Sequence, residues 1–127
     1  MGNIENINSI ICSLSGMNNF ITTPTIYVKI CGDLNSAILL NQIIYWSDKT
    51  KRKDGFFYKT YKEWEDEICL SQYQVKKSID NLESLGLVET KLHKANGSPT
   101  KHYKPNFENL KELMFSYHQK QSVYKET

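Results

Sequence analysis

The chain has 127 residues, of which 39% are hydrophobic and 24% are charged, and its net charge is +2. These values are typical of one soluble globular domain and argue against a disordered chain. No apolar run approaches the roughly 20 residues that span a bilayer, and no signal-peptide pattern begins the chain, so we expect a cytoplasmic protein without a membrane segment.

Three cysteines lie far apart, at Cys12, Cys31 and Cys69. An odd, scattered set favours reduced thiols in a cytosol over a disulfide framework. Because all three have apolar neighbours, we expect them to be small buried side chains rather than reactive thiols.

Residues 1–32 read as an N-terminal helical extension. A first helix is predicted over residues 4–14, where isoleucine and leucine recur at helical spacing. Thr23 followed by Pro24 is typical of an N-cap and a first helical position, so a second short helix is expected to end at Gly32. The residues of this second segment would also suit a strand.

The most apolar helix is predicted to begin at a cap formed by Asp33 or Asn35 and to be the buried central helix. A basic loop over residues 49–55 ends it. The aromatic run 56–58 then predicts a small strand beside a hairpin.

A helix-turn-helix pattern follows. Thr60 and Glu63 form a capping box for its first helix, and Ser71 caps its second, which leaves two residues for the turn. The second helix buries a stripe at Val75, Ile79 and Leu82 and is expected to stop at Gly86. A last helix is expected from residue 106, with a polar, frayed tail from residue 118.

The pattern then changes to a β-hairpin. Residues 87–94 alternate with period 2, and Asn96-Gly97 is a strong turn signal. Pro99 is expected to delay the return strand until Lys101, and Pro105 to end it. The predicted fold is therefore mainly α with a small β-hairpin wing, a winged helix-turn-helix with extra N- and C-terminal helices, in which residues 33–105 are the core and residues 106–127 the C-terminal helix and tail. Such an arrangement lays one helix into a DNA groove.

Four stretches of this core carry a resemblance to a known family. They read Asn-Ser-Ala-Ile-Leu-Leu-Asn-Gln-Ile-Ile-Tyr-Trp at 35–46, Phe-Tyr-Lys-Thr-Tyr-Lys-Glu-Trp at 57–64, Leu-Gly-Leu-Val-Glu at 85–89 and Asn-Gly-Ser-Pro-Thr-Lys-His-Tyr at 96–103. Over roughly residues 20–105 the chain resembles the N-terminal winged-helix domain of phage and plasmid replication-initiation proteins, the replisome organisers related to DnaD-like initiators. The resemblance implies binding of origin DNA. Family members usually continue into a second domain that engages the helicase loader, whereas here a single helix follows.

The second helix of the helix-turn-helix is the predicted reading element. Glutamine can bond adenine, lysine can reach guanine or phosphate, and tyrosine can bond phosphate or stack. The candidate DNA-binding residues of this helix are Ser71, Gln72, Tyr73, Gln74, Lys76 and Lys77. An ordinary solvated helix face would have a similar composition.

The wing and the basic loop supply further candidates. A hairpin tip with lysine and small polar residues can follow a minor groove or hold phosphates, and a basic loop can add contacts that do not depend on sequence. The wing candidates are Lys94, Asn96, Ser98, Lys101 and His102, and the loop candidates are Lys49, Lys51, Arg52 and Lys53. Residues 49–104 hold twelve basic and eight acidic residues, a net of +4, whereas the chain before them has a net of −2. A closing turn, edge protection by lysine and a merely solvated loop are the alternative interpretations.

Enzyme chemistry has little support. There is no phosphate-binding glycine loop, zinc-protease helix motif or nucleophile elbow, and the three histidines do not have the spacing of a zinc site. The acids between Glu63 and Glu67 fit the start of a helix, where they complement its dipole. We therefore expect no enzyme activity, no metal and no cofactor.

The helix-turn-helix and hairpin pattern predicts a DNA-binding protein, and the resemblance implies a protein of a phage or mobile element with a role in replication initiation or an accessory role in replication. The terminal helices are expected to pair two copies into a homodimer, since each has one apolar stripe. The alternatives are a transcriptional repressor of the same fold, a protein-interaction module such as a phage-encoded inhibitor of a host protein, and an accessory protein that stacks single-stranded bases on Tyr73, Phe56 or Tyr58.

Overall fold

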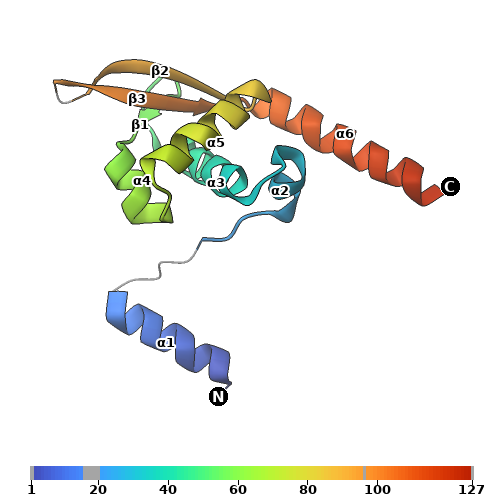
Figure 1. Ribbon diagram of the computed structural model, residues 1–127, viewed down its shortest axis with the longest axis horizontal. Coiled ribbons are helices and arrows are strands. Elements are labelled where there is room, and N and C mark those ends of the chain that lie inside the picture. The colour runs from blue at the N-terminus through green and yellow to red at the C-terminus, as the bar shows by residue number, and fades with distance from the viewer. Residues whose placement is uncertain (1, 16–20, 96, 127) are drawn as a thin grey trace.

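A computed structural model describes residues 2–15, 21–95 and 97–126 of the chain. Those residues form a mainly helical structure with a small three-stranded antiparallel sheet (Figure 1). In chain order the elements are α1 (Asn3–Ser15), α2 (Thr25–Cys31), α3 (Leu34–Lys49), β1 (Phe57–Tyr58), α4 (Tyr61–Ile68), α5 (Gln72–Ser84), β2 (Val88–Ala95), β3 (Ser98–Pro105) and α6 (Phe107–Glu126).

The first helix, α1, lies apart from the other elements (Figure 1). Its isoleucine and leucine stripe faces solvent: Ile4 is 76% exposed, Ile7 56% and Leu14 84%. The helix predicted over residues 4–14 is confirmed, since α1 spans Asn3–Ser15. Its apolar face is largely exposed to solvent.

The turn between α2 and α3 is built by short polar side chains. Asp33 caps α3 by accepting the backbone N–H of Ser36, which decides between the two predicted caps. The Asn81 amide of α5 donates to the backbone oxygen of Cys31 and to Asp33, so it ties this turn to α5. The expected cap at Thr23 is wrong: Pro24 itself is the N-cap of α2, because a proline in the first turn needs no N–H partner.

Helix α3 is the centre of the core, as its sequence predicts. Leu39, Leu40 and Ile43 are fully buried, and they share one apolar cluster with Trp64 of α4 and Val75 of α5. Burial of side chains of this size contributes roughly 1.5–3 kcal/mol each, so this cluster fixes the orientation of α4 and α5.

The turn between α4 and α5 has a strained first residue. Cys69 is the C-cap of α4 in a left-handed conformation with φ of 61°, and its side chain is exposed. The expected burial of Cys69 is therefore wrong, because the tight turn points this side chain outward. Cys31 is buried as expected, and Cys12 is half-buried.

The sheet has the strand order β1-β3-β2, and β3 starts earlier than expected. Pro99 does not delay the return strand: β3 begins at Ser98, and Pro99 pairs with Lys94. The short strand β1 pairs with His102 and Tyr103 of β3 and does not reach Pro99. Because β1 leaves this edge of β3 unpaired, the N–H that Pro99 lacks costs no hydrogen bond between strands.

The two faces of the sheet differ. On the inner face, toward the helices, Val88 and Tyr103 are buried, and the Tyr103 ring lies 5.7 Å from that of Trp64. The outer face carries Glu89, Lys91 and His93 of β2 and Thr100, His102 and Lys104 of β3.

Helix α6 extends from the body at the end opposite the hairpin tip (Figure 1). Leu110 is buried, and Leu113 and Met114 pack against the core cluster. The helix runs to Glu126, so the expectation of a frayed tail from His118 is wrong for the described residues.

Candidate nucleic-acid interface

The first turn of α5 is exposed and firmly capped. Ser71 and Gln74 form a capping box: the backbone N–H of Gln74 donates to the Ser71 hydroxyl at 3.2 Å, and the backbone N–H of Ser71 donates to the side-chain oxygen Oε1 of Gln74 at 2.9 Å. Both side chains are exposed, but they stabilise the helix start rather than remaining free for a ligand. The Ser-x-x-Gln pattern in the sequence could have revealed this role.

Four predicted reading residues of α5 remain available. Gln72, Tyr73, Lys76 and Lys77 are all exposed, and Tyr73 is 72% exposed. The Lys76 ammonium lies 5.6 Å from the centre of the Tyr61 ring at the start of α4. This contact places the Lys76 ammonium beside the start of α4.

The inner face of the hairpin borders the same region. Leu92, Pro99 and Lys101 line a depression of about 320 Å³ together with residues from the start of α4, including Tyr61. Leu92 is 72% exposed despite its apolar side chain. Tyr61 is thus common to both parts, and we call the joint region the helix–hairpin surface, defined by Gln72, Tyr73, Lys76, Lys77, Leu92, Lys94 and Lys101.

The wing candidates have different environments. Lys94 and Ser98 are exposed and Lys101 is half-buried, while Asn96 lies outside the described residues. His102 is only 2% exposed, so the expected contact between this side chain and DNA is wrong. Alternation along β3 places His102 on the outer face, where neighbouring side chains cover it.

The His102 ring is held by three neighbours. Its Nδ1 accepts a hydrogen bond of 2.6 Å from Arg52, because a guanidinium can only donate. Its ring centre lies 5.5 Å from that of Tyr58 and 5.6 Å from that of His93. Burial, followed by the charge of Arg52, lowers the pKa of His102 below 6.5, which favours the neutral ring.

The basic loop lies against the outer face of the sheet. Asp54 accepts hydrogen bonds from Arg52 at 2.8 Å and from Lys91 at 3.3 Å, so it joins the loop to β2. The N–H of Phe56 and then Arg52 lower the pKa of the Asp54 carboxyl well below its usual range. Lys49, Lys51 and Lys53 are exposed. Arg52 is therefore grouped with the outer face and not with the helix–hairpin surface. Lys49 is the last residue of α3, and its ammonium lies 5.3 Å from the centre of the Tyr45 ring.

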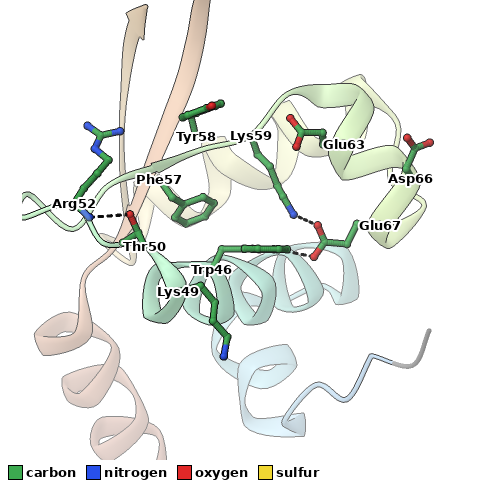
Figure 2. Close-up of a pocket in the computed structure, with 10 residues that line it drawn as sticks. All are labelled: Trp46, Lys49, Thr50, Arg52, Phe57, Tyr58, Lys59, Glu63, Asp66 and Glu67. Atoms are coloured by element: carbon green, nitrogen blue, oxygen red, sulfur yellow. Dashed lines mark hydrogen bonds and ion pairs between the residues drawn. The ribbon is translucent and has the colours of Figure 1, made fainter. Parts of the chain in front are cut away.

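A depression of about 680 Å³ lies between the end of α3, β1 and α4, and Figure 2 shows ten of its residues. The Lys59 ammonium forms an ion pair with Glu67 and lies 3.7 Å from the centre of the Trp46 ring. The Glu67 carboxylate also accepts hydrogen bonds of 2.6 Å from Gln42 and from the Trp46 indole.

Burial lowers the pKa of Lys59 to about 8, against the opposing effect of Glu63. Because the Lys59 and Glu67 charges satisfy each other and Glu67 is further bonded to α3, the cluster joins β1, α3 and α4 and has a structural role. Sequence reasoning missed it, since nothing local distinguishes Lys59 from an exposed lysine.

Metal binding and membrane crossing have no counterpart in the described ranges 2–15, 21–95 and 97–126. Within them, no group of three or more His, Cys, Asp or Glu side chains is placed to hold a metal ion. No helix of that part of the chain is both long enough and apolar enough to cross a bilayer.

Comparison with known proteins does not assign this chain to a family. No protein-family model matches the chain, and no curated protein or solved structure is significantly similar to it. The resemblance to replication-initiation domains therefore stays a prediction from the sequence.

Proposed function

We propose that this chain is a winged-helix DNA-binding protein that reads duplex DNA with α5 and holds the neighbouring backbone with the β2–β3 hairpin. One observation carries the proposal: the exposed first turn of α5 and the inner face of the hairpin border one surface around Tyr61. A recognition helix contacts base edges with its N-terminal residues, and α5 offers Gln72 and Lys76 at that end.

The electrostatics of the helix–hairpin surface support contact with phosphates. It includes four lysines, of which Lys76, Lys77 and Lys94 are exposed and Lys101 is half-buried. Each phosphate that a lysine neutralises releases counterions, so the affinity should fall steeply with salt. A flat salt dependence would favour the alternative of a protein partner.

The biological role is proposed from the resemblance described above. We propose replication initiation, or an accessory role in replication, for a phage or mobile element, in the cytoplasm. A transcriptional repressor would use the same surface, so the bound sequence separates the two roles. Selection of bound duplexes from the DNA of the element should recover repeats beside its replication region. Recovery of promoter operators would favour the repressor, and recovery of no DNA would contradict the proposal.

We propose that the protein acts as a homodimer whose two copies pair through their terminal helices. The exposed stripe of α1 supports this, since Ile4, Ile7 and Leu14 would be covered by a second copy. Light scattering should give about twice the monomer mass of 14.8 kDa, and Ile4→Ser with Ile7→Ser should reduce it to that of the monomer. A monomeric wild-type protein would contradict the dimer.

A further inference from the structure

We propose that the outer face of the β1–β3–β2 sheet, with the basic loop against it, is a second site, which binds single-stranded nucleic acid by stacking bases on Tyr58 and His93. The proposal does not rest on duplex reading by α5, because the two surfaces share no residue. We call this region the outer-face site, defined by Arg52, Phe56, Tyr58, Lys91, His93 and Lys104.

Aromatic rings occur on all three strands of the outer face. The register pairs Tyr58 of β1 with His102 of β3, and His102 with Lys91 of β2. The rings of Tyr58 and His93 both contact the ring of the buried His102, which therefore positions them. Tyr58 is 43% exposed and His93 is also exposed, so both rings offer surface to a ligand. Figure 2 shows Tyr58 pointing away from Trp46 and α3, whereas Phe57 points toward them.

Cations surround these rings. The ammonium groups of Lys91 and Lys104 lie 4.2 Å and 5.7 Å from the centre of the Phe56 ring. Arg52 reaches the His102 ring from the loop, whose Lys51 and Lys53 are exposed. The acids of this face are Asp54, which is bonded to Arg52 and Lys91, and Glu89, which is paired in register with Lys104. The basic groups therefore outnumber the acids.

This combination fits an unpaired strand better than a duplex or an acidic peptide. In a duplex the faces of the bases are covered by stacking on neighbouring base pairs. In a single strand the bases can stack on aromatic side chains while lysine and arginine side chains bind the phosphate backbone. A three-stranded face offers room for about two or three stacked bases. An acidic peptide would use the lysines but would gain little from the exposed Tyr58 and His93 rings.

The test measures binding of labelled oligonucleotides by fluorescence anisotropy, using an oligothymidine of about 12 nucleotides and a mixed-sequence duplex. Tyr58→Leu removes the exposed ring and should weaken single-strand binding about tenfold while changing duplex binding less than about twofold. Tyr45→Leu is the matched control, because Tyr45 is a tyrosine of similar exposure, 49%, that lies on α3 instead of the sheet. This control should change neither affinity.

Two further variants separate the sites. Lys53→Gln with Lys104→Gln should weaken single-strand binding and reduce its salt dependence. Lys76→Gln with Lys77→Gln should leave single-strand binding within about twofold, even though these residues belong to the proposed duplex site. Loss of both affinities in the α5 variant would overturn the outer-face site. A wild-type protein that binds the single strand but no duplex would overturn only the proposed function.

Photo-crosslinking provides a readout that does not depend on affinity. A strand carrying 5-bromodeoxyuridine should crosslink to the peptides that contain Tyr58 or His93. Crosslinks confined to α5, no single-strand binding by the wild-type protein at low salt, or equal displacement by polyglutamate of matched charge would each overturn the proposal.

Discussion

The inner and outer faces of the sheet are made by the same strands and have opposite environments. On the inner face Phe57 is 8% exposed and Tyr103 is fully buried, whereas on the outer face the next residue, Tyr58, is 43% exposed. Inner residues are fixed by packing against Trp64, so their identity follows from the fold. An exposed ring makes few packing contacts, so packing does not explain why aromatic rings and cations lie together on the outer face. The single-stranded ligand that we propose for the outer-face site would explain it. His102 is the exception, since it lies on the outer face and is nevertheless buried.

The largest expected effect separates the two tyrosines. Tyr103→Leu should lower the free energy of unfolding by about 2–3 kcal/mol, because it removes ring contacts with Phe57 and Trp64 in a fully buried site. Tyr58→Leu should change it by less than about 1 kcal/mol. Urea denaturation monitored by circular dichroism measures both, and equal losses would remove the distinction between the faces.

The next effect compares two lysines. Lys59→Met should lower the free energy of unfolding by about 2 kcal/mol, since Glu67 would then keep its charge without its buried cation. Lys91→Met, at an exposed ion pair of the outer face, should change it by less than about 0.5 kcal/mol. A double-mutant cycle with Glu67→Gln should show that the two residues of the buried pair are coupled, and independent effects would contradict this interpretation.

A smaller effect tests the buried histidine of the outer face. The pKa of His102 is lower in the folded protein than its ordinary value of 6.5, so the unfolded chain binds more protons below that pH. Stability from the neutral ring is present above about pH 6.5 and is lost as the pH falls through the folded pKa. Thermal unfolding between pH 7 and pH 5 should therefore show a loss of stability that is absent in His102→Phe. The same pH dependence in both proteins would show that His102 is not its source.

Local sequence signals predicted much of the fold. Thr60 with Glu63, and Ser71, marked the helix starts because capping needs only neighbouring residues. The alternation of β2 and the Asn-Gly turn predicted the hairpin for the same reason. Errors arose where the partner is distant in the sequence: nothing near Pro99 reveals that β1 leaves its edge free, and nothing near Cys69 fixes its outward direction.

The candidate site was less predictable for the same physical reason. Gln72 and Lys76 are exposed where helical spacing placed them. Burial of His102 depends on Arg52, Tyr58 and His93 from three other segments, and spacing along β3 could not show it. The position of the basic loop beside Lys91 likewise depends on how the loop folds back through Asp54.

The most direct test of the proposed function compares two pairs of exposed lysines in duplex DNA binding. Lys76→Gln with Lys77→Gln, on α5, should weaken binding of the selected duplex at least about tenfold at moderate salt. Lys51→Gln with Lys53→Gln removes the same charge from the basic loop and should weaken it less than about threefold. Unchanged affinity in the α5 variant, or equal losses in both variants, would contradict reading of DNA by α5.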